Sequence, residues 1–256
     1  MKTIFFSICD SKLQQGLPNS RNLDFKGFIN SFKKFHPDIE MIIFNERDMV
    51  AHGGVNYYNA KAAFGNLLST GDNLVVNVDA DHYFFDRCTE ILEADYDIAC
   101  PANFNETNNL VGIKVSSGIT GNGNPNWLVT EQEFLQGGLI ASPSKQFWNH
   151  YKYATDKYYD KFVCFENDVL NLAAYLYPYK VKVLDGSTDF NSKEKTSWYG
   201  CSIINKEKNC YIENGKIMLE GKPVKAYHFA HGSAKKTYAE VFSKEVSEFI
   251  KQNIIV

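Results

Sequence analysis

Short apolar runs and amphipathic stretches alternate along the first hundred residues. The apolar runs are brief and rich in β-branched and aromatic residues, which is typical of buried strands. The stretches between them repeat apolar residues at the three- and four-residue spacing of one helix face. The predicted strands are Thr3–Cys9, Ile39–Phe44, Leu74–Val78 and Asp97–Cys100, and the predicted helices are Phe25–Phe35, Tyr57–Leu68 and Arg87–Glu93. This alternation predicts an α/β fold with a mostly parallel central sheet flanked by helices.

Residues 102–130 interrupt this pattern with many asparagines and glycines. Polar loops of this length inside compact domains are usually functional or disordered. We therefore expect a loop over a substrate site, with plain disorder as the alternative. Strand and helix signals resume after it. They predict strands at Phe134–Ala141 and Val181–Leu184, and helices at Ser144–Tyr159 and Phe165–Leu176.

The last fifty residues carry a hairpin signal. Asn214-Gly215 lies between alternating residues of Asn205–Leu219, and this dipeptide suits a tight antiparallel turn. Val224–Phe229 predicts a final strand, and Tyr238–Ile250 predicts a closing helix. We therefore expect a small antiparallel hairpin near the C-terminus.

Composition narrows the classes of function. A chain of 256 residues without an evident linker suits one domain spanning residues 1–256. The formal net charge of −3 gives no electrostatic footprint for nucleic acid, and no apolar run reaches membrane-spanning length. The six cysteines show no zinc spacing, and the N-terminus lacks the apolar core of a signal peptide. We expect a cytoplasmic protein without a membrane span, whose Cys9, Cys88, Cys100 and Cys164 are buried thiols.

Asp79 and Asp81 follow the apolar strand Leu74–Val78 directly. Alternation along an extended segment would put both carboxylates on one side and Ala80 on the other. No basic residue lies close in sequence to compensate their charge, Arg87 being the nearest. Two adjacent carboxylates at the carboxyl end of a strand therefore predict a Mg²⁺ or Mn²⁺ site that can bridge a diphosphate. The alternative is an ordinary solvated turn.

An order of features along the chain resembles that of GT-A-type glycosyltransferases. It comprises an N-terminal strand–helix repeat, an Asp-x-Asp after a mid-chain strand, an acidic helix start and a late histidine. Three segments extend the resemblance, and the last two are similar to the retaining branch that includes glycogenin and bacterial lipooligosaccharide galactosyltransferases. They are residues 136–140 (QGGLI), 166–171 (ENDVLN) and 228–235 (HFAHGSAK). The last segment departs from that branch by one extra residue before Gly232 and by lacking Pro-Trp after Lys235.

This resemblance implies a nucleotide-diphosphate sugar, most often a UDP-sugar, as the donor and a glycan or other hydroxyl compound as the acceptor. It implies Mn²⁺ or Mg²⁺ held by Asp79, Asp81 and His228, with His231 as the alternative histidine. It also implies a nucleotide-sugar-binding half in residues 1–101 and an acceptor-binding half in residues 102–256.

The resemblance further implies roles for residues around the predicted metal. Asp10 is a candidate for uracil or ribose, or else it only caps a turn. Lys61 is a candidate for the donor, or else it lies on a solvated helix face. The expected donor-binding residues are Ser7, Cys9, Asp10, Lys61, Asn77, Ala80 and Lys235, and the expected sugar- or acceptor-binding residues are Gln136, Gly137, Gly138 and Asn167.

Glu166 and Asp168 are the candidates for catalysis at the sugar carbon. An inverting enzyme needs a carboxylate to accept the acceptor proton, and a retaining enzyme needs a group that stabilises the reacting centre. Alternatively, both acids only stabilise a helix N-terminus.

Two other functions are compatible with the same pattern. A sugar-phosphate nucleotidyltransferase would need a glycine-rich loop after the first strand, where residues 7–17 contain only Gly16. A non-catalytic sugar-binding protein on the same fold would bind a donor without turning it over.

Overall fold

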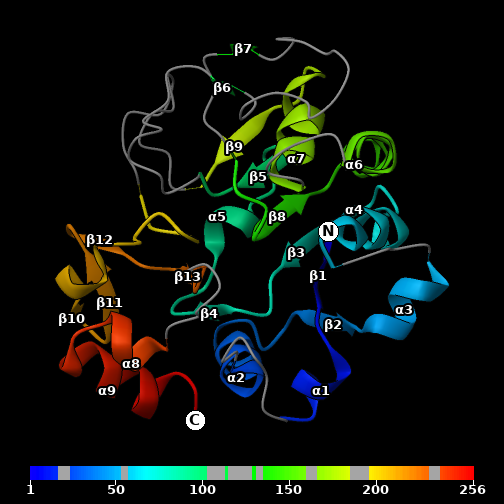
Figure 1. Cartoon of the computed structure of the whole chain (residues 1–256). Coiled ribbons are helices and arrows are strands. Elements are labelled where there is room, and N and C mark those ends of the chain that lie inside the picture. Colours follow the sequence, from blue (N-terminus) through cyan, green and yellow to red (C-terminus); the bar gives the residue numbers. More distant parts are fainter. Residues whose placement is uncertain are drawn as a thin grey trace.

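A six-stranded sheet forms the centre of the computed structural model (Figure 1), in the order β2-β1-β3-β8-β5-β9. The structure describes residues 1–16, 24–52, 57–102, 113–114, 129–130, 135–159, 166–184, 196–230 and 237–256. The strands of this sheet are β1 Lys2–Ile8, β2 Glu40–Phe44, β3 Asn73–Val78, β5 Ile98–Cys100, β8 Leu139–Ser142 and β9 Val181–Val183.

The sheet is mostly parallel, as the sequence predicts. Strand β1 pairs in parallel with both β2 and β3, and β5 pairs in parallel with β9. Strand β8 is antiparallel to its neighbours β3 and β5. It begins at Leu139 rather than at the predicted Phe134, because side chains take the backbone groups just before it. The Gly137 amide donates to Asn167, and its carbonyl accepts from Lys61.

Helices cover both faces of the sheet (Figure 1). One face packs against α4 Tyr57–Leu68, α6 Lys145–Tyr158 and α7 Glu166–Tyr175. The other packs against α2 Phe25–Phe35 and α5 Thr89–Leu92. Short helices α1 Ser11–Gln14 and α3 Glu46–Ala51 follow β1 and β2.

Helix α4 has the predicted bounds, and its apolar pattern, which puts Ala62, Ala63, Leu67 and Leu68 inside, is mostly confirmed. Leu67 is the exception at 51% exposed, whereas Lys61 is buried. Gly65 lies so close to Trp148 of α6 that a Cβ there would meet the indole at 2.1 Å. Because Gly65 has no side chain, α4 packs closely against α6, and Lys61 then faces the edge of the sheet.

The C-terminal part forms a smaller unit beside the main sheet. It contains the predicted hairpin, whose turn residues Asn214 and Gly215 both have the positive φ of a tight hairpin turn. The predicted closing helix is divided, because the Ser243 hydroxyl accepts from the Val246 amide and starts a new helix. Its elements are η3 Glu207–Asn209, β10 Tyr211–Glu213, β11 Lys216–Leu219, β12 Lys222–Pro223, β13 Ala226–His228, α8 Tyr238–Val241 and α9 Lys244–Asn253.

Strand β4 His82–Phe84 joins the two parts, because it pairs antiparallel with β13 and places His82 opposite His228. The sequence analysis did not predict this short strand. Two further short strands, β6 Ile113–Lys114 and β7 Val129–Thr130, pair with each other within the predicted long loop. The rest of that loop lies outside the described residues, apart from Ala102.

Ala102 and Leu135 form an isolated antiparallel bridge beside β5. The side chain of Asn171 on α7 reinforces it, since its Oδ1 accepts from the Leu135 amide at 2.8 Å and its Nδ2 donates to the Leu135 carbonyl at 2.9 Å. The two ends of the segment between Ala102 and Leu135 therefore lie side by side.

Three of the four cysteines that were predicted to be buried thiols are buried in the described part of the chain. Cys9, Cys88 and Cys100 are buried and free, whereas Cys164 lies outside the described residues. Within the described ranges, no helix combines the length and the apolar character needed to cross a membrane.

Candidate active site

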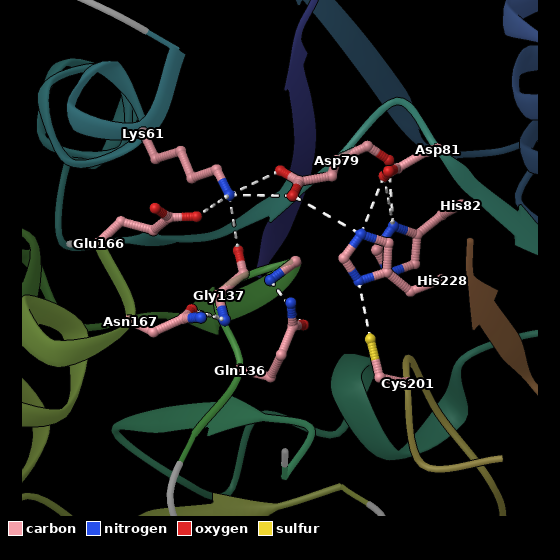
Figure 2. A network of polar contacts seen from close by, with 11 residues as sticks. Lys61, Asp79, Asp81, His82, Gln136, Gly137, Glu166, Asn167, Cys201 and His228 are labelled. Atoms are coloured by element: carbon pink, nitrogen blue, oxygen red, sulfur yellow. Dashed lines mark hydrogen bonds and ion pairs between the residues drawn. The ribbon is translucent and has the colours of Figure 1, made fainter. Parts of the chain in front are cut away.

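Charged side chains from four separate elements meet where β3 ends (Figure 2). Asp79 and Asp81 follow β3 in a turn closed by the His82 amide, which donates to the Asp79 carbonyl at 3.2 Å. The expected extended alternation is therefore wrong for this segment. Both carboxylates nevertheless approach one atom, His228 Nε2, at 3.9 Å from Asp79 and 3.0 Å from Asp81.

Lys61 of α4 supplies a cation that the sequence analysis did not pair with Asp79. Its Nζ lies 2.8 Å and 3.0 Å from the two Asp79 oxygens. It also donates to the Gly137 carbonyl at 3.0 Å and lies 3.7 Å from Glu166 Oε1. With 3% of its surface exposed, Lys61 does not lie on a solvated helix face. Burial lowers its pKa, but the charges of Asp79 and Glu166 outweigh that effect and keep it protonated.

His228 is held on several sides. Its Nε2 faces Asp81, and its Nδ1 lies 3.1 Å from the sulfur of Cys201. Its backbone amide donates to the Gly200 carbonyl at 3.0 Å. Gly138 leaves room for the ring, since a Cβ there would lie 2.5 Å from its Nδ1. Burial lowers the pKa of His228, but the neighbouring carboxylate of Asp81 and sulfur of Cys201 raise it well above the ordinary histidine value.

His82 stacks on His228, with ring centroids 4.3 Å apart and planes inclined by 13°. Its Nδ1 lies 3.1 Å from the Asp79 carbonyl, while its fully buried Nε2 has no partner among the described residues. Burial and the charge of His228 lower the pKa of His82 far below the usual value, so this ring is neutral. His82 was not predicted as part of the site, although it directly follows Asp81 in the sequence.

These residues fit a divalent cation. One ligand atom from each of Asp81, His82 and His228 can be chosen so that all three lie within 4.8 Å of one another. A single ion with bonds of roughly 2.1 Å can collect donors at nearly this spacing after small side-chain adjustments. Carboxylate oxygen and imidazole nitrogen together suit Mn²⁺ and its neighbours in the transition series. Asp79 can join such an ion only while sharing its charge with Lys61.

The glycine turn before β8 is fixed by two amide side chains. Asn167 Oδ1 accepts from the Gly137 amide, and Gln136 Oε1 accepts from the Gly138 amide, each at 2.8 Å. The side chains of Asn167 and Gln136, which were expected near the sugar, therefore also fix the backbone next to His228.

Glu166 lies within the site, at the first position of α7. Burial raises the pKa of its carboxyl group, and the opposing charge of Lys61 only partly offsets this. Asp168 is fully buried, and helical geometry turns its side chain by roughly 200° from that of Glu166. Of the two acids, Glu166 is therefore the one that faces Lys61.

The other predicted donor residues differ in their surroundings. Ser7, Cys9, Asn77 and Ala80 are buried, and the side-chain polar atoms of Ser7 and Asn77 have no partner in the described part of the chain. Asp10 caps α1 by accepting from the Lys12 amide at 2.7 Å, which is the turn role that the sequence left open. The donor residue Lys235 and the alternative metal histidine His231 lie outside the described residues.

A cavity of about 470 Å³ lies near the carboxyl ends of β1 and β2. Polar side chains from α1, from the start of α3 and from the residue after β2 line it. Glu46 ties the two segments together by accepting from the Ser11 amide at 2.9 Å. The lining residues are Ser11, Gln14, Gln15, Asn45 and Arg47.

Comparison with solved structures identifies the fold. No known family profile matches the sequence, and no curated protein sequence matches it. The galactosyltransferase LgtC, solved with donor and acceptor sugar analogues, superposes with a TM-score of 0.58 at 12% identity, over 100% of this chain and 97% of that one. The bifunctional glycosyltransferase WbbM gives 0.59 at 13% identity, over 99% of this chain and 49% of that one.

A third structure agrees with these two. The glycosyltransferase GlyE of Streptococcus pneumoniae gives a TM-score of 0.51 at 13% identity, over 98% of this chain and 63% of that one. The chain therefore has the GT-A fold of these glycosyltransferases, as the sequence analysis expected.

Proposed function

We propose that this protein is a metal-dependent glycosyltransferase that moves a sugar from a nucleotide-diphosphate sugar, most simply a UDP-sugar, to a hydroxyl of a glycan or other acceptor. One observation carries the proposal. Lys61, Glu166 and the Asp81–His228 pair reach the same edge of the sheet from four different elements. Open α/β sheets bind their ligands at the carboxyl ends of the strands, where these residues lie.

The donor would lie along this edge of the sheet. The cavity at the ends of β1 and β2 is polar and suits the base and ribose. From there the diphosphate would extend toward Asp81. Residues 1–101 would then supply most contacts to the donor, and residues 102–256 would supply Glu166, His228 and the contacts to the acceptor.

Asp79, Asp81 and His228 would hold Mn²⁺ or Mg²⁺, and the nitrogen ligand favours Mn²⁺. The ion, when bound, supplies positive charge that stabilises the diphosphate as it leaves. His82 lies close enough to be a further ligand of such an ion. The neutral stacked ring also keeps water from the inner side of His228.

Lys61 and Glu166 would act at the sugar. Lys61 keeps Asp79 and Glu166 in place and balances their negative charge. Glu166 is the side chain that can accept a proton from the acceptor hydroxyl or stabilise the reacting carbon on its near face. The first role leads to inversion at that carbon, and the second leads to retention.

A panel of UDP-, GDP- and CMP-sugars with Mn²⁺ tests the proposal, using thermal shift for binding and nucleotide release for turnover. We expect one donor both to stabilise the protein and to be consumed. Asp81→Asn should abolish turnover. Asp72→Asn is the matched control, because Asp72 is exposed just before the opposite end of β3.

Each outcome separates the proposal from its alternatives. Stabilisation by a donor without any turnover, alone or with acceptors, would indicate a non-catalytic sugar-binding protein. Release of pyrophosphate from a nucleotide and a sugar phosphate would indicate a nucleotidyltransferase. If Asp81→Asn behaves like Asp72→Asn, the proposed active site is wrong.

A further inference from the structure

Cys201 is in contact with the ring of His228 on the side away from the carboxylates. Its Sγ lies 3.1 Å from Nδ1, and both residues are buried, with 0% and 4% of their surfaces exposed (Figure 2). The sequence analysis gave Cys201 no role, because it belongs to no metal or redox motif.

The chain folds locally so that Cys201 reaches this position. Gly200 has a φ of +59°, and its carbonyl accepts from the His228 amide at 3.0 Å. The left-handed backbone at Gly200 suits glycine in particular. Trp198 and Gly200 are hydrogen-bonded to Lys225 and His228, and Cys201 follows directly with its thiol at the imidazole.

The two ring nitrogens of His228 have different surroundings. Nε2 is the atom next to Asp81, and it can bind a cation only when it carries no proton. In that neutral form Nδ1 carries the proton and needs an acceptor. The sulfur of Cys201 is a weak acceptor at hydrogen-bond distance from Nδ1. Partners of this kind fix the orientation and tautomer of metal-binding histidines.

We propose that Cys201 is a positioning residue for the metal site: it accepts a hydrogen bond from His228 Nδ1 and so directs Nε2 toward a cation held with Asp81. This inference rests on the metal dependence proposed above. His82 and Gly138 confine the ring, but only Cys201, among the described residues, is recorded at hydrogen-bond distance from Nδ1.

A packing role for Cys201 makes a different prediction. Cys201 and Cys210 belong to the same apolar cluster of the C-terminal unit, with 0% and 5% of their surfaces exposed. A buried thiol behaves there as a small hydrophobic group. If Cys201 served only in packing, Cys201→Ala and Cys210→Ala would change Mn²⁺ binding to a similar extent.

The test is the dissociation constant of Mn²⁺, measured without donor or acceptor by isothermal titration calorimetry and by electron paramagnetic resonance of free Mn²⁺. Cys201→Ala should weaken Mn²⁺ binding by about 10- to 100-fold, the usual effect of losing such a partner. Cys201→Ser, which keeps a shorter acceptor, should lie between the parent and Cys201→Ala. Cys210→Ala should bind Mn²⁺ like the parent. Circular dichroism and thermal melting check that each variant is folded.

The outcomes distinguish this inference from the proposed function. If the parent binds Mn²⁺ and Cys201→Ala binds it equally well, the role of Cys201 is refuted while the metal site stands. Equal weakening in Cys201→Ala and Cys210→Ala would show a packing effect and would also refute it. If the parent binds no Mn²⁺, both the inference and the metal dependence fail. If Cys201→Ala does not fold, the comparison of Cys201→Ser with the parent decides the question.

Discussion

The Nζ of Lys61 lies 2.8 Å from Asp79 Oδ1, so that a helix and the end of the neighbouring strand are joined by an ion pair whose amine is buried and whose carboxylate is 26% exposed. Asp79 is the first acid of the Asp-x-Asp segment and was expected to hold a metal together with Asp81 and a late histidine. Lys61 instead shares that carboxylate and also reaches Glu166 and the Gly137 carbonyl. One protonated amine thus holds together groups from three elements.

Replacing Lys61 by Met should destabilise the protein by roughly 2 kcal/mol, because removing the buried amine leaves the partly buried carboxylates of Asp79 and Glu166 without their compensating charge. Urea unfolding at neutral pH measures the change. Lys152→Met is the control, since its pair with Asp156 is an exposed i,i+4 contact worth at most about 0.5 kcal/mol. Equal losses in the two variants would contradict a special role for Lys61. Adding Asp79→Asn to Lys61→Met should recover part of the loss.

Gly138→Ala should disturb the metal site through His228. Its new Cβ would lie 2.5 Å from two atoms of the imidazole, which must then move away from Asp81. We expect Mn²⁺ to bind at least about tenfold more weakly, as measured by calorimetry. Gly137→Ala is the neighbouring control, because its Cβ would meet Asn167 Oδ1 at 2.9 Å rather than His228. Unchanged Mn²⁺ binding in Gly138→Ala would show that the ring position does not matter.

Glu166→Gln should lower kcat for the donor and acceptor found in the screen by about 10²- to 10⁴-fold, the usual contribution of a positioned acid or base. Donor binding, followed by thermal shift, should change little because the amide keeps the shape of the side chain. Asp168→Asn is the comparison. It should change the melting temperature more than kcat, since Asp168 is fully buried. The assignment of Glu166 fails if Asp168→Asn gives the larger loss of kcat.

His36 should make the stability of the protein depend on pH. The ring is stacked on Phe32, and its Nε2 accepts from the Cys88 amide at 3.1 Å. Burial, together with the charge of Arg87, lowers its pKa from 6.5 to about 4. The unfolded chain therefore binds a proton first as the pH falls, and stability decreases between pH 6.5 and pH 4, by up to about 3 kcal/mol.

Urea unfolding at pH 7.5, 6, 5 and 4 measures this effect. His36→Gln, which keeps an acceptor for the Cys88 amide, provides the reference. The stability difference between the parent and His36→Gln should shrink or reverse on acidification. A difference that stays constant over this range would mean that His36 does not titrate as its environment predicts.

Apolar periodicity was sufficient to predict the bounds of the long helices α2 and α4. The bounds of α2 and α4 agree with the prediction because caps and amphipathic faces are local properties of the sequence. The short strand β4 was not predicted, since three residues carry no periodicity and its partner β13 lies far along the chain. For the same reason, the stacking of His82 on His228 was not visible before the strands were paired.

One contact of the candidate site followed from the family resemblance, whereas contacts between side chains outside the recognised motifs were missed. Asp81 and His228 were expected to approach one another, and they do. A basic partner for Asp79 could not be predicted, because Lys61 reaches it only after α4 packs beside β3. The apolar pattern of α4 also put Leu67 inside, whereas the contact of Gly65 with Trp148 sets the rotation of the helix.

The bridge between Ala102 and Leu135 brings together the two points at which residues 103–134 join the framework. The two junctions are adjacent, and Asn171 fixes the one at Leu135. The entropic cost of closing a loop grows only slowly with its length, so a longer or shorter insert between the same anchors costs little stability. A foreign segment grafted between these two anchors would leave the charged groups at the strand ends in place.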